Sequence, residues 1–398
     1  MIDWRRNLAA LWFAQFTAIF GFAFAFPFLP LFLSELGVGG SHDLAFWAGL
    51  AGGAAGLAQS VASPFWGVLA DRYGRRSMLL RAMAGGGVTV ALMGVAQSPL
   101  QLVLLRLLQG ASSGTVAAAT ALVATNTPRE RVGWSLGVMS SAVALGAALG
   151  PLVGGLGAHF YGVRAIFLVG GVALLGSAVP VLVVVREAPV RRAGGPPPPP
   201  AIATLRATGA LKAVAVLIAA QGLIQISFTA FQPLLTIRFL QVAPANAATL
   251  TGLAFAAAGA ASAASALTYT WLVPRFGYRG LAFFAAALLS GAEVVSGFSP
   301  TVTAIVIGAG IAGLFYGVLG PATSSMMGLE SKPEIQGRVF GAAASSTALG
   351  FRLGPLIGGG AGALFSIQTG MTVAAAAALV LSLLMGTLGR EPRAPARL

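Results

Sequence analysis

Three ionisable side chains stand inside long apolar stretches of this sequence: Arg106, Glu293 and Arg352. A charge inside a membrane-spanning helix costs roughly 2.5 to 3.5 kcal/mol on insertion scales, so such a residue faces the protein interior or a water-filled cavity. Glu293 is the only carboxylate clearly inside such a stretch, and it could take up and release a proton. The two arginines could bind helix carbonyls or a neighbouring acid, and Arg106 could instead influence protonation or attract an anionic substrate.

A second group of charges lies between two apolar runs, in the stretch GVLADRYGRRSMLL at residues 67–80. A charged segment this short between two spans must lie at a membrane face, and short cytoplasmic loops carry the excess of Lys and Arg. We therefore predict a cytoplasmic hairpin. Its pattern, G-x-L-x-D-R-x-G-R-R-x-x-L, includes Gly67, Asp71, Arg72, Gly74, Arg75 and Arg76.

A glycine-rich pattern occurs twice, as GAALGPLVGG at 146–155 and GFRLGPLIGG at 350–359. Glycines four residues apart let another helix approach closely, and a proline inside a helix removes a backbone donor and permits a bend. The pattern predicts close helix packing at 146–155, and the second copy marks an internal repeat. Its members are Gly146, Gly150, Pro151, Gly154 and Gly155 in the first copy, and Gly350, Arg352, Gly354 and Pro355 in the second.

Other kinds of chemistry have little support in the composition. The chain has no cysteine and two histidines, which excludes disulfides and thiolate chemistry and argues against a metal site. Paired carboxylates inside the apolar stretches are also missing, so a membrane enzyme lacks the groups it would need. We expect no cofactor and no bound metal.

The elements that position these residues must be transmembrane helices. Hydrophobic residues make up 57% of the chain and charged residues 9%, against about 25% charged residues in a soluble domain. About twelve apolar runs approach the roughly 20 residues that a spanning helix needs, and a β-barrel would show short alternating segments instead. The expected helices lie at about 8–33, 45–70, 78–96, 100–124, around 145–155, 164–185, 212–237, 247–272, 280–298, 301–327, 340–365 and 370–389.

The distribution of basic residues predicts the topology. The net charge is +14, and every Lys and Arg except Arg106, Arg164, Arg238 and Arg352 falls in a segment that we assign to one face. The positive-inside rule then places both termini in the cytoplasm. The excess of basic residues therefore reflects the membrane topology, and nucleic acid is not expected as a partner.

An internal repeat divides the chain into two halves. The two glycine-rich copies are offset by 204 residues, and RYGRR at 72–76 recurs as RFGYR at 275–279 with an offset of 203. A parallel repeat of this kind predicts two six-helix bundles, at 1–187 and 212–398. The linker at 188–211 contains five consecutive prolines, which favour a stiff polyproline II spacer; an SH3-type ligand is the alternative.

These motifs resemble those of the major facilitator superfamily. The 67–80 pattern is similar to the family's loop 2–3 signature, and R-x-x-Q-G through Arg106, Gln109 and Gly110 is similar to its helix 4 motif. The string G-x-x-x-G-P-x-x-G-G resembles the motif of its drug and proton antiporters. IDWRRNL, PFLPLF and GWSLG further resemble the twelve-helix multidrug efflux subgroup.

The resemblance implies a latch role for Asp71. In the family the equivalent acid contacts the start of helix 11 and helps to hold the outward-open state. The second half has Pro274 at the position equivalent to Asp71, so only the first half carries this acid. The alternative is a loop ion pair with Arg72 or Arg75, a surface interaction worth roughly 0 to 1 kcal/mol.

Proton coupling needs a group whose charge changes during transport. Glu293 is the main candidate, and Arg106 and Asp71 are further ones. The alternative for Glu293 is a structural carboxyl that is hydrogen-bonded near the outer interface.

The resemblance also places helices 1, 4, 7 and 10 around a central cavity. Aromatic and amide side chains there suit loose binding of amphipathic molecules, although a single phenylalanine could equally serve packing. The cavity candidates are Gln15, Phe20, Arg106, Gln109, Gln221, Gln225, Phe231 and Tyr316.

Taken together, these features predict a monomeric exporter of small amphipathic drugs or toxic compounds in the bacterial inner membrane. The proton gradient would drive it by alternating access, with the lipid bilayer as its surroundings. Two intramembrane cations against one acid favour an anionic, zwitterionic or neutral substrate over a dicationic one. The alternatives are a narrow-specificity exporter of a metabolite, sugar or lipid-like molecule, and a sensor that does not transport.

Overall fold

The computed structural model describes residues 3–187, 201–207 and 209–392. Every regular element within these ranges is a helix, so the predicted all-α membrane fold is confirmed. The run of prolines expected to form a spacer lies in 188–200, outside the described residues. Next to it, α10 (Ala201–Ala207) is a short helix inside the range expected to be the linker.

The first half contains six spans, several of which are built from two helical segments. The first helix starts earlier than expected because the Asp3 carboxylate accepts hydrogen bonds from the backbone amides of Arg5 and Arg6, at 3.0 and 3.3 Å. The elements are α1 (Trp4–Ala25), η1 (Phe26–Phe28), α2 (Leu29–Glu35), α3 (Ser41–Tyr73), α4 (Arg75–Gly94), α5 (Pro99–Ser112), α6 (Thr115–Asn126), η2 (Arg129–Arg131), α7 (Val132–Tyr161), α8 (Val163–Gly176) and α9 (Ala178–Val183).

The second half repeats this arrangement with longer uninterrupted helices. One long element contains two spans, which are separated only by the non-helical residue Gly277. The elements are α11 (Leu211–Val242), η3 (Pro244–Asn246), α12 (Ala247–Phe298), α13 (Val302–Glu330), α14 (Pro333–Leu364) and α15 (Ile367–Thr387). Ten segments of the described chain are long and apolar enough to cross a membrane; with the second span of α12 and with α14, they make up the twelve predicted spans.

The first span is not the single helix that we expected over about 8–33. It passes through the short 3₁₀ segment η1 between α1 and α2. Pro27 and Pro30 each lack a backbone N–H and so interrupt the α-helical hydrogen-bond ladder here.

The fourth span, expected as one helix over about 100–124, is also interrupted. Ser113 between α5 and α6 has extended backbone angles, φ −74° and ψ 177°. Its hydroxyl donates to the carbonyl of Gly110 at 3.0 Å, and its own carbonyl accepts from Arg81 Nη2 at 3.2 Å. Local bonds of this kind compete with the helical ladder.

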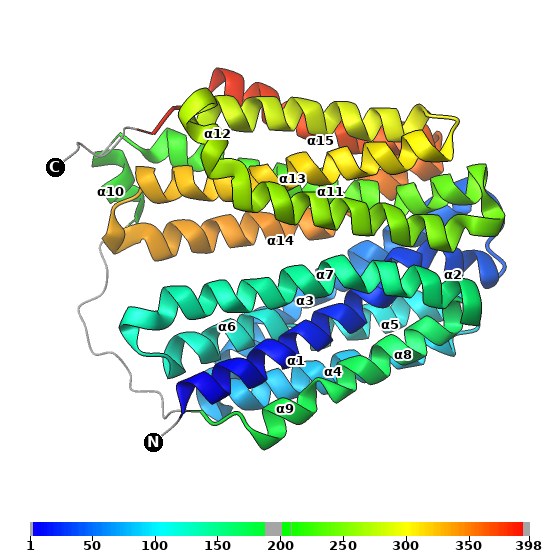
Figure 1. Ribbon diagram of the computed structural model, residues 1–398, viewed down its shortest axis with the longest axis horizontal. Helices are drawn as coiled ribbons and strands as arrows, with labels where there is room; N and C mark the ends of the chain where they lie inside the picture. Colours follow the sequence, from blue (N-terminus) through cyan, green and yellow to red (C-terminus); the bar gives the residue numbers. More distant parts are fainter. Residues whose placement is uncertain (1–2, 188–200, 208, 393–398) are drawn as a thin grey trace.

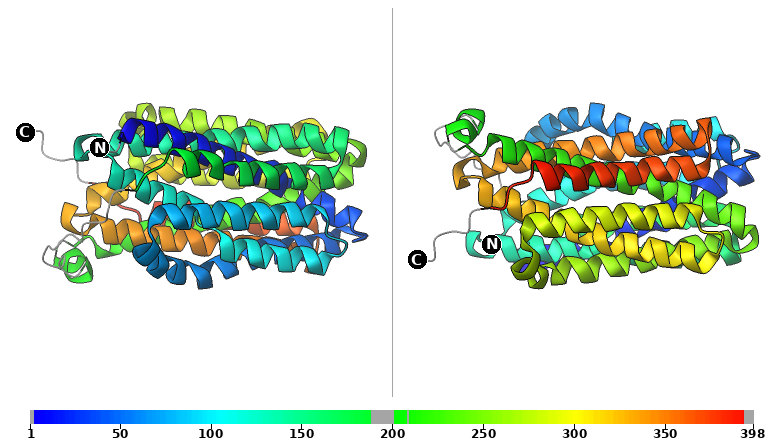
Figure 2. Two further views of the ribbon diagram at one scale, coloured as in Figure 1. Left: turned by 90° about the horizontal axis from the view of Figure 1, so that it is seen from below. Right: turned by 90° about the horizontal axis from the view of Figure 1, so that it is seen from above.

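The two halves lie one above the other in Figure 1, with the long helices running along the long axis of the molecule. Figure 2 shows the same alignment from below and above. The halves meet at the right-hand end of Figure 1, which we name the closed end. They diverge toward the left, where the chain passes from α3 to α4 and where α12 turns back on itself, and we name this the open end.

Glycines join the halves along two seams at the closed end. Between α3 and α14, a Cβ built on Gly49 would lie 2.6 Å from the carbonyl oxygen of Pro355. Between α7 and α12, a Cβ on Gly155 would lie 2.8 Å from the Cα of Gly252. Any side chain larger than hydrogen would force these helices apart, so the seams depend on glycine.

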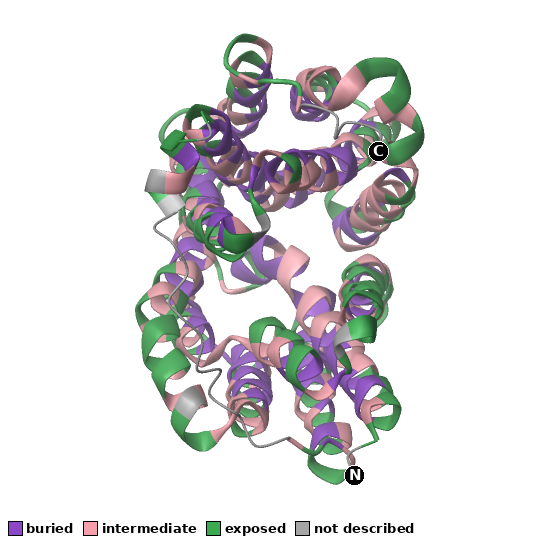
Figure 3. Cartoon of the chain, turned by 90° about the vertical axis from the view of Figure 1, so that its left-hand side faces the viewer, coloured by how far each residue is buried: buried purple, intermediate pink, exposed green. Residues whose placement is uncertain are grey.

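The same helices lose contact toward the open end. A Cβ added to Gly137 of α7 or to Gly341 of α14 would meet no neighbouring atom within 4 Å. Figure 3 views the molecule from this end and shows the two bundles on either side of a central gap. The helix seams are therefore closed at one end only.

Candidate functional site

The hairpin between the second and third spans is held by an acid that sequence analysis missed. Gly74 joins α3 to α4 with φ +88°, a left-handed region that glycine adopts without strain. The carboxylate of Glu187 then accepts hydrogen bonds from the backbone amides of Arg75 and Arg76, at 2.8 and 3.0 Å. This acid caps the N-terminus of α4, where a negative charge is favourable.

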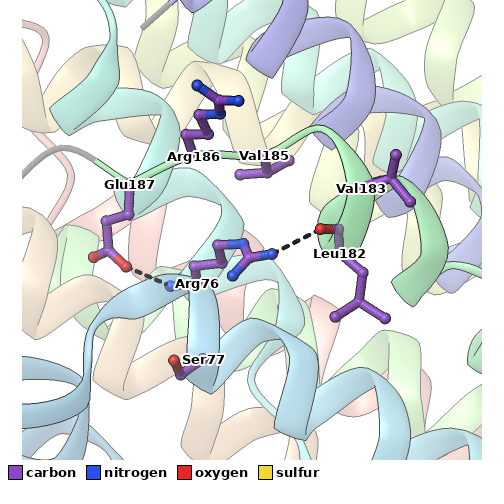
Figure 4. A pocket seen from close by; sticks show the side chains of 7 residues that line it. All are labelled: Arg76, Ser77, Leu182, Val183, Val185, Arg186 and Glu187. Carbon is purple, nitrogen blue, oxygen red and sulfur yellow. Dashed lines mark hydrogen bonds between the residues drawn. The ribbon is translucent and has the colours of Figure 1, made fainter.

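Arg76 completes the same contact from the other side. Its guanidinium donates to the carbonyls of Val181 and Leu182 at the end of α9, at 3.3 and 2.8 Å. Figure 4 shows Glu187 reaching the backbone of Arg76 and the side chain of Arg76 reaching Leu182. The third and sixth spans are thus tied together at the open end.

The second half contains a matching clamp. Gly277 has φ +67°, and the carboxylate of Glu391 accepts from the backbone amides of Tyr278 and Arg279 at 2.8 and 2.9 Å. The guanidinium of Arg279 donates to the carbonyls of Met385 and Gly386. A sequence signal for both acids exists, because Arg-Glu at 186–187 recurs at 390–391 with the 204-residue offset of the repeat.

The remaining residues of the loop motif have more varied surroundings. Arg75 Nη1 donates to the carbonyl of Ala121 in α6 at 3.0 Å, and the guanidinium of Arg72 lies 5.4 Å from the centre of the Tyr73 ring. A Cβ on Gly67 would meet no neighbouring atom within 4 Å. The side chain of Asp71 lies outside the described part of the structure, so its latch contact stays a prediction.

The first glycine-rich motif gives α7 two packing faces. Gly146, Gly150 and Gly154 lie against the backbone of α1, where a Cβ on Gly150 would be 2.9 Å from the carbonyl oxygen of Phe20. Gly155 lies against α12 of the other half, and Pro151 is inside the helix. The motif therefore connects a helix of its own half to the seam.

The second copy plays the same part in α14. Gly350 and Gly354 lie against α11, where a Cβ on Gly350 would be 2.6 Å from the carbonyl oxygen of Gly222. Pro355 faces Gly49 and Gly52 of α3 across the other seam. Each half thus presents its glycine-rich helix to the opposite half.

Arg106 is buried, with 8% of its surface exposed. Its Nε donates to the carbonyl of Ala51 in α3 at 3.0 Å, and Nη1 donates to Oε1 of Gln109 at 2.9 Å. The guanidinium also lies 4.2 Å from the centre of the Phe26 ring, a favourable cation–π distance. The backbone carbonyl, the glutamine amide and the phenylalanine ring together stabilise the charge of the Arg106 guanidinium.

Glu293 in the second span of α12 is 1% exposed. Its two carboxylate oxygens share the hydroxyl of Ser227 in α11, at 2.9 and 3.0 Å. No cation pairs with it among the described residues. An ionised carboxylate in such surroundings is costly unless it is paired, which makes this the most unusual acid of the described chain.

The candidates of the seventh and tenth spans form two hydrogen-bonded groups. The hydroxyl of Tyr316 donates to Oε1 of Gln225 at 3.3 Å, and its ring stacks on Phe228 with centroids 4.1 Å apart. Gln221 Nε2 donates to the hydroxyls of Thr323 and Ser324, both at 3.1 Å. These residues of α11 and α13 form one polar and aromatic surface.

Two buried amides have unused hydrogen-bonding groups. Both Nε2 and Oε1 of Gln15 in α1 lack a partner among the described residues, and so does Nε2 of Gln225. Buried polar groups in proteins are nearly always paired, so such atoms call for an explanation, and a ligand is one. None of the hydrogen bonds of the described candidates links one half to the other.

The two candidate phenylalanines differ in their surroundings. Phe20 belongs to an aromatic row along α1, with ring centroids 6.0 Å from Phe16 and 5.6 Å from Phe24. Phe231 is 5% exposed and packs in the apolar core. The surroundings of Phe231 are those of a packing residue, whereas Phe20 is partly accessible.

Comparison with known proteins places this architecture in a family. The model of the Major Facilitator Superfamily matches residues 11–243 and 217–398. The chain is 34% identical to the multidrug resistance protein MdtG of Enterobacter lignolyticus, over 99% of this chain and 95% of that protein. It is 33% identical to the MdtG protein of Escherichia coli, over 95% of this chain and 93% of that protein.

Solved structures show the same fold at low sequence identity. A bacterial homologue of the human lysosomal transporter Spinster superposes with a TM-score of 0.78 at 15% identity, covering 98% of each chain. The nucleoside transporter NupG gives 0.77 at 14% identity, covering 98% of this chain and all of that one. With twelve helical spans in two matching halves and its full-length likeness to multidrug resistance proteins, this multi-pass membrane protein belongs to the major facilitator superfamily.

Proposed function

We propose that this protein exports amphipathic compounds in exchange for protons, by rocking its two halves around a site between them. It works in the bacterial inner membrane with its open end toward the cytoplasm. The arginines of the turns at Gly74 and Gly277 gather at that end, which supports this orientation through the positive-inside rule. The MdtG relatives, whose names describe multidrug resistance, support the substrate class.

The bond between Glu293 and Ser227 carries the proton part of the proposal. Because the described residues give the carboxylate one hydroxyl partner and no cation, adding or removing its proton changes the free energy of packing α11 against α12. Ser227 lies two residues from Gln225, which carries an unused amide donor. A proton bound at Glu293 and a substrate bound at Gln225 would therefore act on the same short segment of α11.

The substrate part rests on the polar and aromatic surface of α11 and α13. The stacked pair of Tyr316 and Phe228 offers a flat apolar surface, and Gln225 offers hydrogen bonds beside it. A site with few polar groups and much aromatic area accepts amphipaths of different shapes. A membrane potential of 100 mV contributes about 2.3 kcal/mol for each net charge moved, enough to sustain an outward gradient.

Proton flux in proteoliposomes tests this proposal. A pH gradient is imposed, a panel of anionic, neutral and cationic drugs is added, and wild type is compared with Glu293→Gln. The control is Glu35→Gln, which changes an exposed acid at the end of α2. We expect Glu293→Gln to lose substrate-triggered proton flux while substrate counterflow, which needs no net proton movement, persists.

Other outcomes would overturn the proposal in distinct ways. Full proton flux in Glu293→Gln, together with its loss in Asp71→Asn, would move coupling to the loop motif. Substrate movement without proton flux in wild type would exclude proton antiport. Movement of one compound class only would identify a narrow-specificity exporter instead.

A further inference from the structure

Arg352 differs from the other arginines placed within the spans. Arg106 binds a carbonyl, an amide and a ring. Arg81 donates to the carbonyl of Ser113 and lies over the ring of Trp66 at 3.6 Å. Arg352 has no hydrogen bond, ion pair or ring partner among the described residues, and it is only half-buried.

The helix position of Arg352 lies deep in the membrane. At about 1.5 Å per residue, Arg352 is about 28 Å along α14 from its start at the open end, close to the middle of the helix. An unpaired guanidinium at this depth is costly. A partner for it must come from outside the described chain or from a different arrangement of the halves.

Arg352 is one of the residues that line a groove at the seam between the halves. The groove is formed by α3, α5 and α14, and its walls are mostly apolar, with Val61, Leu107 and Leu353 among them. Ser60 is its other polar lining residue, and the Ser60 hydroxyl donates to the carbonyl of Gly56 at 2.7 Å. One cation among aliphatic side chains matches a molecule with one acidic group and an apolar body.

The groove faces the bilayer. Val61 is 82% exposed, and Leu57 and Val68 share its face of α3 at helical spacing and are also exposed. The polar residues Gln59 and Ser63 point away from this face, toward the other side of the helix. A ligand dissolved in the membrane would therefore reach the groove directly.

The groove also lies where the two halves begin to separate. A Cβ on Gly56 would lie 2.6 Å from Cγ of Arg352, which is the contact between α3 and α14 nearest the open end among the glycine contacts of this seam. Beyond it, Gly67 and Gly341 meet no neighbouring atom within 4 Å. A ligand held here would touch both halves at the place where their distance changes.

We propose that this seam groove binds amphipathic carboxylic acids that enter it from the bilayer, with Arg352 pairing with the carboxylate. A guanidinium binds a carboxylate through two parallel hydrogen bonds. A phospholipid head group stays outside the hydrocarbon core of about 30 Å, whereas a single-chain acid can enter that core as the neutral acid. That the groove serves as an entry site for acidic substrates rests on the proposed export function. That the groove binds carboxylic acids does not depend on that function.

Photolabelling of the full chain tests binding without transport. The protein is placed in phosphatidylcholine nanodiscs with a diazirine-bearing palmitic acid, and labelled peptides are identified by mass spectrometry. The matched probe is the corresponding diazirine-bearing fatty alcohol, which has the same chain and no charge. We expect the acid to label peptides of α3 and α14 at the groove, and Arg352→Gln to reduce this labelling at least about tenfold.

Three variants separate a specific site from a general loss of structure. Arg352→Lys keeps the charge and should retain part of the labelling, and Val61→Trp should block the groove with Arg352 in place. Arg238→Gln, which changes an arginine at the far end of α11, should leave labelling unchanged, and thermal unfolding checks that each variant is folded. Val61→Trp keeps the test valid if Arg352→Gln fails to fold.

Three results would overturn the proposal. One is equal labelling of the groove by acid and alcohol in wild type, and another is undiminished acid labelling in both Arg352→Gln and Val61→Trp. The third is displacement of the acid by a small fraction of phosphatidylglycerol, which would make the groove a phospholipid site. Failure of the proton-flux experiment would not change the outcome of the photolabelling experiments, because photolabelling measures binding alone.

Discussion

At the scale of single residues, some buried polar groups of the described chain are hydrogen-bonded and others have no hydrogen-bond partner there. Gln109 and Gln15 are both buried glutamines of the first half. Gln109 accepts a hydrogen bond from Arg106, whereas neither polar atom of Gln15 has a partner among the described residues. The same side chain therefore has a structural role at one position and is free to bind a ligand at the other.

This difference predicts opposite effects of the same substitution. Gln15→Met removes no hydrogen bond, so the melting temperature should stay the same or rise, while substrate binding weakens by about threefold to tenfold. Gln109→Met leaves the Arg106 guanidinium without its amide partner and should cost about 1 to 3 kcal/mol of stability. Thermal unfolding and equilibrium substrate binding in detergent check both variants. Equal destabilisation by the two would show that Gln15 has a structural partner.

At the scale of helices, α7 and α14 each pack in two directions. The glycines of α7 lie against α1 of the same half on one side and against α12 of the other half on the second. α14 does the same with α11 and α3. A motif that resembles the antiporter signature is thus, in physical terms, a smooth surface with two packing faces, one toward its own half and one toward the other half.

Adding one methyl group should show what the seam does. A Cβ at Gly155 would lie 2.8 Å from the Cα of Gly252, so Gly155→Ala must push the closed end apart, at a cost of about 1 to 3 kcal/mol. Gly137→Ala on the same helix meets only open space and serves as the control. We expect a lower melting temperature and lower substrate flux for Gly155→Ala alone. Wild-type behaviour of Gly155→Ala would mean that the seam is looser than these contacts indicate.

At the scale of the whole molecule, contacts between the halves are concentrated at the closed end. There the hydroxyl of Thr236 donates to the carbonyl of Pro27 at 2.9 Å, and His42 Nδ1 lies 2.8 Å from the carbonyl oxygen of Ala363. The clamps of Glu187 and Glu391 tie helices within each half at the open end. Each half is therefore braced internally where it has lost contact with the other, as a rigid rocking body needs to be.

Spin labels can test the proposed rocking motion directly, because the chain has no cysteine. One pair, Tyr73→Cys with Phe340→Cys, reports the open end, and Phe46→Cys with Leu364→Cys reports the closed end; all four side chains are exposed. We expect substrate and a pH gradient to shorten the first distance and lengthen the second.

The same labels test the latch predicted for Asp71. If this acid stabilises the state in which the open end has closed, Asp71→Asn should reduce the population of short distances between positions 73 and 340. The control is Asp43→Asn, at the opposite end of α3. An unchanged distribution in Asp71→Asn would favour the loop ion pair.

The sequence by itself determined the features that depend on local composition and on the repeat. Spans of about twenty apolar residues can only be helices in a bilayer, so most of the helical spans follow from hydropathy, although α14 is not among the segments apolar enough to cross on that criterion. The 204-residue offset divided the chain into two halves, and α14 repeats the packing of α7 because the same glycine spacing produces the same smooth face. The charges of the 67–80 stretch placed a turn between α3 and α4 on physical grounds alone.

Only the tertiary structure decided which distant groups meet. The cap by Glu187 and the pairing of Glu293 with Ser227 each join residues that lie more than sixty positions apart in the chain. Hydropathy carries no information on such pairings, since it is the same for an arginine that finds a carbonyl and for one that does not. The break at Ser113 and the closure of one end also depend on tertiary structure, because Arg81 of α4 reaches the break and the backbones of helices from different halves meet at the closed end.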